Sequence, residues 1–141
     1  MRKLAFLIFA ALAACVTISA VSRAEPRTFS IISVDVPPGW SAVEVDSSVI
    51  MVSDDGEASI TVTVETAEGL NAQQIAVQMA KALDAPAPVW DELSGGWTFE
   101  FLAGGDAGRA IVLVESDQGI ILTLMGDRED IPEIVRSMKL P

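Results

Sequence analysis

The sequence predicts an α+β fold in which a largely antiparallel sheet of about eight strands is covered by two amphipathic helices. Short apolar segments with period-two alternation recur along the chain, and turn-forming Gly, Asp and Pro residues separate them. Two longer stretches have the period of a helix instead. Half of the 141 residues are hydrophobic, so the chain has enough apolar material for one core.

The first group of expected strands precedes residue 66. Residues 28–36 form one expected strand, whose alternation changes phase near Ile31 and indicates a bulge. Pro37 and Pro38 end it, because each proline removes a backbone donor. The other strands of this group are expected at 42–46, 49–53 and 58–65, with a hairpin turn at 53–56. Residues 25–27 are expected to be a linker.

A helix is expected over 72–83, where the apolar residues form one stripe: Ala72, Ile75, Ala76, Met79 and Leu83. Asn71 and Gln74 have the spacing of a capping box, and Pro86 prevents the helix from continuing. A second helix is expected over 131–138, with Asp130 and Glu133 as its caps.

The second group of expected strands lies between these helices, at 89–93, 97–102, 110–115 and 120–125. Glycine-containing turns at 94–96, 104–108 and 117–119 indicate that consecutive strands are antiparallel. The strands at 110–115 and 120–125 are apolar on both faces, so we expect them at the centre of the sheet.

The N-terminal segment predicts export. Basic residues precede an almost unbroken apolar run at 4–21, and Ser22-Arg23-Ala24 places small residues where a signal peptidase cleaves. We therefore expect a signal peptide at 1–24, a single domain at 25–141 and a periplasmic location. Two alternatives remain open. Leu12-Ala13-Ala14-Cys15 resembles the lipobox of membrane-anchored lipoproteins acylated at Cys15, and the apolar run is also near the minimum length of an uncleaved anchor.

The charge of the chain limits its partners. Three of the nine basic residues lie in the expected signal peptide, so residues 25–141 carry six basic and twenty acidic side chains and a net charge near −14. This excess of negative charge argues against binding to nucleic acid or to an anionic membrane surface, because phosphate contacts require Lys and Arg. We expect no membrane contact unless Cys15 is lipidated. Since Cys15 is the only cysteine, the expected domain contains no disulfide.

Several short motifs resemble those of a known family. A strand that ends in Pro-Pro-Gly-Trp (36–40), a Gly-Trp-Thr-Phe strand (96–99) and a final helix that ends in Val-Arg-Ser-Met-Lys (135–139) are similar to motifs of the PsbP/DcrB-like family. The resemblance covers nearly all of residues 28–141. It implies an α/β/α sandwich and a non-enzymatic accessory or binding role, and it assigns no functional residue.

The residue types present argue against an enzyme. The chain contains no His, so it has neither a Ser-His nor a Cys-His pair and no His-ligated metal. No cofactor is expected. A hydrolase that uses paired carboxylates remains a weaker alternative, because any acidic protein can supply two carboxylates.

Two acidic turns suggest a calcium-binding alternative. Asp54, Asp55 and Glu57 lie on the turn at 54–57, and a second acidic turn occupies 127–130. Calcium binds carboxylate oxygens in such loops, but neither turn has the EF-hand spacing. A hairpin turn and a helix cap explain both runs without a metal, so the acidic turns remain an alternative and no metal site is predicted.

The tryptophans are the candidate partner contacts, because Trp is enriched at protein interfaces. Trp90 follows Pro86 and Pro88, which favour an edge strand, and the acids Asp91 and Glu92 lie beside it. Trp40 lies just after the diproline turn. The alternative for each ring is that it closes the edge of the core. The sequence therefore predicts a non-catalytic domain that binds an unidentified envelope protein, and it leaves the oligomeric state open.

Overall fold

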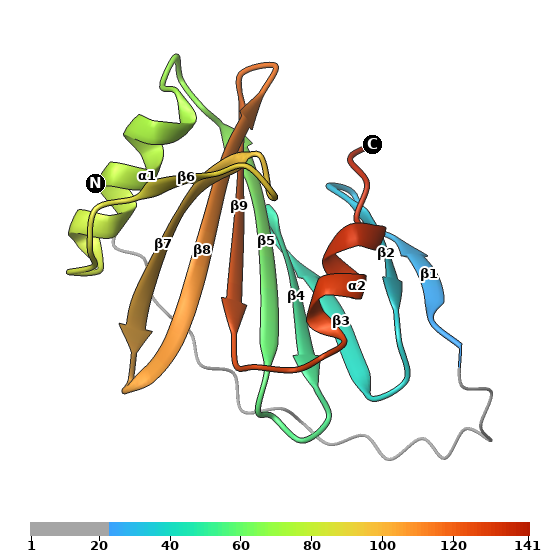
Figure 1. Cartoon of the computed structure of the whole chain (residues 1–141). Coiled ribbons are helices and arrows are strands. Elements are labelled where there is room, and N and C mark those ends of the chain that lie inside the picture. Colours follow the sequence, from blue (N-terminus) through green and yellow to red (C-terminus); the bar gives the residue numbers. More distant parts are fainter. Residues whose placement is uncertain (1–22) are drawn as a thin grey trace.

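The computed structural model describes residues 23–141 (Figure 1). Nearly all of the expected signal peptide, with Cys15, lies outside the described residues. A hairpin of β1 (Glu25–Thr28) and β2 (Ser33–Val36) forms a small sheet. The larger sheet consists of β3 (Trp40–Val45), β4 (Ser48–Ser53), β5 (Ser59–Thr66), β6 (Val89–Asp91), β7 (Gly96–Ala103), β8 (Asp106–Glu115) and β9 (Gln118–Met125). The helices are α1 (Ala72–Ala82) and α2 (Ile131–Ser137).

The larger sheet is antiparallel throughout, with the spatial order β3-β4-β5-β9-β8-β7-β6. Tight turns connect neighbours in sequence, such as Gly104 and Gly105, which both have positive φ, between β7 and β8. β9 is the middle strand and β8 lies beside it. The predicted α+β class and the central position of these two strands are confirmed.

The prediction of a single strand at 28–36 is wrong. The chain reverses between β1 and β2, where the Phe29 backbone N–H donates to Ile32 C=O at 2.8 Å, and the two strands pair with each other. The phase change that indicated a bulge near Ile31 therefore marks a turn. Residues 25–27, expected as a linker, belong to β1. In the second half, β8 begins at Asp106, because the turn before it needs only two glycines.

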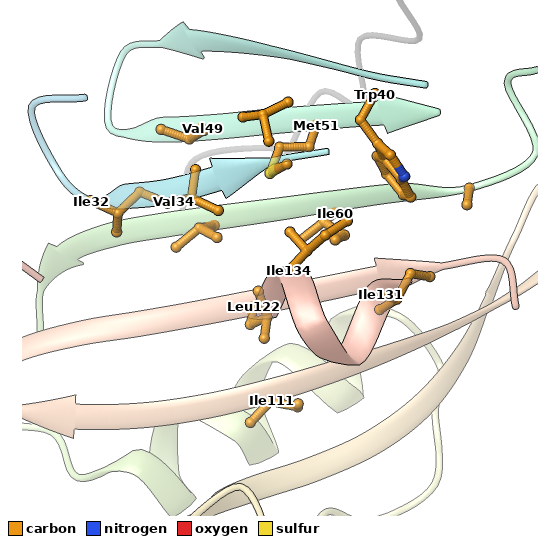
Figure 2. Close-up of a cluster of buried hydrophobic side chains, with 13 residues drawn as sticks. Ile32, Val34, Trp40, Val49, Met51, Ile60, Ile111, Leu122, Ile131 and Ile134 are labelled. Atoms are coloured by element: carbon orange, nitrogen blue, oxygen red, sulfur yellow. The ribbon is translucent and has the colours of Figure 1, made fainter. Parts of the chain in front are cut away.

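The two faces of the large sheet are covered by different elements. On one face, α2 and the strand β2 with the residue before it pack over the sheet. Figure 2 shows their side chains directed toward those of β4, β5 and β9. The residues that meet there are Ile32, Val34, Ile131 and Ile134 from the covering elements and Met51, Ile60 and Leu122 from the sheet. On the other face, α1 packs on β7 and β8 (Figure 1). Successive strand residues point to opposite faces, so neighbours such as Ile111 and Val112 belong to different clusters.

Helix α1 begins at the capping box that the sequence predicts. The Gln74 N–H donates to Asn71 Oδ1 and the Asn71 N–H donates to Gln74 Oε1, both at 2.9 Å. The predicted apolar stripe is confirmed, and the buried residues of the helix, Ala76 of that stripe and Ala80 beside it, face the aromatic row of β7. Small side chains at these positions let the helix approach the bulky rings of Phe99 and Phe101.

Helix α2 begins differently from the prediction. Asp130 is the N-cap residue, but its side chain makes no capping hydrogen bond. Its carboxylate instead accepts from Trp40 Nε1 at 2.7 Å and from Arg128 Nε at 3.3 Å. Glu133 is the acid of the first turn. The Asp130 side chain, expected to cap α2, therefore links the start of α2 to Trp40 at the start of β3.

Candidate functional site

The strand β6 forms one edge of the large sheet, as predicted from the prolines that precede it. It pairs with β7 on one side and has no outer neighbour among residues 23–141. Its surface is apolar: Val89 is 63% exposed, Trp90 is 52% exposed, and Leu93 in the following turn is 99% exposed. We call Val89, Trp90 and Leu93 the β6 edge.

Trp90 is held in place by a second tryptophan. It lies opposite Trp97 in the pairing of β6 with β7, and the two rings form an edge-to-face pair with centroids 6.0 Å apart. Trp97 packs against the core under α1, whereas half of Trp90 remains in contact with solvent. Aromatic pairs of this geometry contribute about 0.5–1.5 kcal/mol beyond area burial, so Trp97 holds the Trp90 ring in its orientation.

The two acids predicted beside Trp90 have different surroundings. Asp91 accepts hydrogen bonds from Ser94 Oγ at 2.8 Å and from the Leu93 N–H at 3.3 Å, and it forms an ion pair with Arg109 at 3.2 Å. The hydrogen bond from Ser94 is the largest influence on the pKa of Asp91, which lies below its usual value. Asp91 therefore shapes the turn, while Glu92 is exposed at its tip.

An open hollow adjoins the β6 edge. It has a volume of about 420 Å³ and lies between the segment that enters β6 and strands β7 and β8. Pro86, Ala87 and Val89 form its apolar wall, and Glu100 and Arg109 lie on its other side. The register places Val89, Glu100 and Arg109 on the sheet face opposite to Trp90. The β6 edge thus offers an apolar ring on one face and a partly charged hollow on the other.

The opposite edge of the sheet is protected. Arg27 donates from Nη1 to the Ala42 C=O of β3 at 3.2 Å, and Ser30 donates from its N–H and its hydroxyl to the Glu44 carboxylate. These contacts come from β1 and the turn after it. The hairpin therefore lies against β3 and occupies its Ala42 C=O, although β3, like β6, has no outer strand among the described residues.

Trp40 does not share the exposure of Trp90. Its side chain is 6% exposed and packs in the core cluster with Val36, Ile131 and other residues of that face (Figure 2). Its Nε1–H donates to Asp130, and the Arg128 guanidinium lies 5.7 Å from its ring centroid. The structure therefore places Trp40 in the role of closing the edge of the core, which the sequence left open as the alternative.

The acidic turns are used within the fold. Asp55 accepts from Ser53 Oγ at 2.6 Å and from the Glu57 N–H at 3.0 Å, and it forms an ion pair with Arg128 at 2.7 Å. The bond from Ser53 is the main cause of the lowered pKa of Asp55. Asp54 and Glu57 are exposed. Within residues 23–141, no three acidic side chains are arranged to hold a metal ion.

Asp130, in the second acidic turn, has competing influences. Partial burial is the largest single influence and raises its pKa, but the hydrogen bonds from Trp40 and Arg128 and the charge of Arg128 together lower the pKa below its usual value. The ionised Asp130 is thus stabilised by internal partners, and Arg128 joins it to the other acidic turn through Asp55.

Three members of this region were not singled out from the sequence. Val89 and Leu93 were missed because single exposed apolar residues are common and carry no pattern. Arg109 was missed because its ion pair with Asp91 depends on β6 and β8 lying on the two sides of β7. The prediction of β6 as an edge strand was the signal that could have led to Val89 and Leu93, whereas no local signal points to Arg109.

Comparison with known proteins identifies the architecture. No family model and no curated protein sequence matches the chain. Among solved structures, cyanobacterial PsbP (CyanoP) from Synechocystis sp. PCC 6803 is similar with a TM-score of 0.55 and 12% identity, over 92% of this chain and 99% of that chain. The chain has a PsbP-like fold. A mutant of protein Mog1 is also similar, with a TM-score of 0.52 and 13% identity, over 77% of this chain and 90% of that one.

The PsbP-like fold confirms the resemblance that the sequence motifs suggested, at the level of architecture. At 12% and 13% identity, neither structure assigns a function to particular residues here. Neither helix within residues 23–141 has the length and apolar character needed to cross a bilayer.

Proposed function

We propose that this chain is an exported, non-catalytic accessory domain that binds another protein of the bacterial envelope through the β6 edge. The observation that supports the proposal is the contrast between the two ends of the large sheet. Both β3 and β6 lack an outer strand among the described residues, but Arg27 and Ser30 of the β1–β2 hairpin contact β3, whereas β6 pairs with β7 alone and carries, with its turn, three exposed apolar side chains. An uncovered apolar edge favours association with another chain.

Trp90 is the proposed anchor of this contact. Interfaces obtain most of their binding energy from a few aromatic or Arg side chains that become fully buried, surrounded by residues that exclude water. Half of the Trp90 ring is available for such burial, and its contact with Trp97 has already fixed its orientation. Val89 and Leu93 supply apolar surroundings.

The non-catalytic part of the proposal rests on chemistry. The chain has no His and no Tyr, and its one Cys lies in the expected signal peptide, so general bases and activated nucleophiles are scarce. Three acids have lowered pKa values: Asp55, Asp91 and Asp130. Each accepts hydrogen bonds from residues of the same domain and lies beside an Arg of that domain. A catalytic acid at neutral pH needs a raised pKa instead.

The export proposal rests on the N-terminal sequence, and intact-mass measurement of the protein extracted from its host tests it. We expect the mature chain to begin at Glu25, because Ser22-Arg23-Ala24 fits the cleavage rule. A chain that begins at an acylated Cys15 would contradict this expectation and place the domain on a membrane.

The interface itself is tested by crosslinking in the producing cells. A photoreactive residue at position 93 should crosslink to one envelope protein, and the same residue at position 43 on β3 should not, although Val43 is 53% exposed. Trp90→Ala in the position-93 variant should abolish the crosslink. It should lower the free energy of unfolding by about 1.5–3 kcal/mol, from the aromatic pair and from the half of the ring that is buried.

Two results would overturn the interface. One is equal crosslinking from positions 43 and 93. The other is a crosslink that survives Trp90→Ala. A loss of about 3–5 kcal/mol in Trp90→Ala, the cost of removing a buried aromatic side chain, would show that Trp90 serves the core.

A further inference from the structure

We infer that the Asp55-Gly56 peptide is a site of isoaspartate formation that the folded chain keeps unreactive by holding both reacting groups in hydrogen bonds. Asp55-Gly56 is the only Asp-Gly pair in the sequence. Such a pair is especially prone to this modification, because glycine has no Cβ to hinder attack by its own backbone nitrogen. The inference concerns covalent chemistry at the β4–β5 turn and is independent of the proposed function.

The modification needs only the chain itself and water. The Gly56 nitrogen attacks Asp55 Cγ and forms a C–N bond, while the hydroxyl of the carboxylic acid and the proton of the N–H leave together as water. The product is a cyclic succinimide. Its hydrolysis at Cγ restores aspartate, whereas hydrolysis at the main-chain carbonyl carbon leaves the backbone running through Cγ, which is isoaspartate.

The carboxylate of Asp55 is occupied by three donors. Its Oδ1 accepts from Ser53 Oγ at 2.6 Å and from the Glu57 N–H at 3.0 Å, and its Oδ2 accepts from Arg128 Nη1 at 2.7 Å. These contacts, first of all the bond from Ser53, favour the ionised form and lower the pKa of Asp55. Because ring closure consumes the carboxylic acid, the hydrogen bonds to the carboxylate must be lost before the reaction.

The attacking nitrogen is occupied as well. The Gly56 N–H donates to the Ser53 C=O at 2.8 Å and so closes the turn between β4 and β5. Attack on Cγ requires this nitrogen to give up its proton and to direct its lone pair at the side chain of Asp55. A well-aligned hydrogen bond to a backbone carbonyl opposes both changes. The reaction therefore requires the turn to open at the carboxylate and at the backbone together.

Arg128 makes this protection a property of the tertiary structure. It lies between β9 and α2, 73 residues from Asp55 in sequence, and it also donates from Nε to Asp130 at 3.3 Å. An isolated peptide of the β4–β5 turn lacks this donor, so only the folded chain supplies the complete set. Isoaspartate at position 55 should therefore accumulate in molecules whose turn has separated from the loop that carries Arg128.

Incubation of the purified protein, as its host produces it, in heavy-oxygen water at neutral pH tests the inference. Each passage through the succinimide places one solvent oxygen at residue 55, whether hydrolysis yields aspartate or isoaspartate, and mass spectrometry of the digested chain measures this uptake. The reference is a synthetic peptide of residues 51–59 in the same buffer. We expect the folded chain to react at least about tenfold more slowly than the peptide, because hydrogen bonds to a charged group must break first.

Matched variants assign the protection to its donors. Ser53→Ala and Arg128→Gln should each raise the rate of oxygen uptake by about two- to fivefold, the range for contacts of partly exposed charges. Ser48→Ala removes a hydrogen-bonded hydroxyl elsewhere on β4, and Arg27→Gln removes a hydrogen-bonded guanidinium from β1. Neither control residue contacts Asp55, so both controls should leave the rate unchanged.

Two results would overturn the inference. One is a folded wild-type chain that takes up solvent oxygen at residue 55 as fast as the peptide. The other is a rate that rises equally in the control variants and in Arg128→Gln. If Ser53→Ala does not fold, because Ser53 is buried, Arg128→Gln decides alone, since the Arg128 side chain is 34% exposed and lies outside both core clusters.

Discussion

Trp40→Ala should lower the free energy of unfolding by about 3–5 kcal/mol, the usual cost of removing a large buried aromatic side chain. The ring is 6% exposed and lies in the core cluster between the strands and α2. Its loss would leave a cavity and would also remove the donor that Asp130 accepts at 2.7 Å. Urea unfolding of the variant and the wild type measures the difference. A loss below about 1 kcal/mol would contradict the assignment of Trp40 to the core.

Trp40→Phe separates the ring from its hydrogen bond. It should cost less, about 1–3 kcal/mol, because most of the apolar volume remains while a hydrogen bond to a charged group is lost. The pKa of Asp130 in the folded chain lies below its ordinary value of 3.8, so the ionised carboxylate stabilises the fold at pH values above 3.8. This contribution is lost as the pH falls through the folded-state pKa. The difference between wild type and Trp40→Phe should therefore be present at neutral pH and shrink below about pH 3.8. A difference that is independent of pH would mean that the hydrogen bond contributes little.

Gly126→Ala should lower the free energy of unfolding by about 2–5 kcal/mol. Gly126 follows β9 with φ +79°, where an L side chain costs about 1–2 kcal/mol. A Cβ at this position would also collide with the Glu57 carbonyl oxygen and lie 3.0 Å from Ala58 Cα, and overpacking of this kind costs about 1–3 kcal/mol. Both contacts are backbone atoms, which cannot rotate away as a side chain does. Thermal unfolding followed by circular dichroism measures the loss.

Gly56→Ala is the matched control. Gly56 lies in the β4–β5 turn with φ +74°, but a Cβ there meets no atom within 4 Å. It should lose only the conformational part, about 1–2 kcal/mol. Equal losses in the two variants would show that the approach of Gly126 to the β4–β5 turn does not matter, and only its φ does.

The elements that the sequence predicted well are those with a local cause. The capping box at Asn71 and Gln74 and the glycine turn at Gly104 and Gly105 depend on residues a few positions apart, and the structure contains both. The central position of β8 and β9 followed from their apolar character on both faces. The edge position of β6 followed from Pro86 and Pro88, which cannot donate to a neighbouring strand.

The errors have a distant cause. The strand expected at 28–36 is divided because β1 folds back on β2, and alternation alone does not distinguish a bulge from a reversal of direction. Asp130 looked like a helix cap, but its carboxylate is used by Trp40, ninety residues away in sequence. In the same way, the ion pair of Arg109 with Asp91 requires the register of three strands. Such contacts are set by tertiary structure and leave no local pattern.

The strand order of the large sheet has a consequence for how the chain folds. Every pair of neighbours is also consecutive along the chain, with the exception of β5 and β9, which join one meander (β3-β4-β5) to another (β6-β7-β8-β9). Each meander can form through short loops, whereas pairing Ile60 with Leu124 and Val62 with Leu122 must close a loop that contains α1 and three strands. Loop closure of this length delays non-local pairing. The β5–β9 seam is therefore the step at which two locally formed halves become one cooperative sheet, and a slip of one residue there would turn the apolar side chains of one half away from the core of the other.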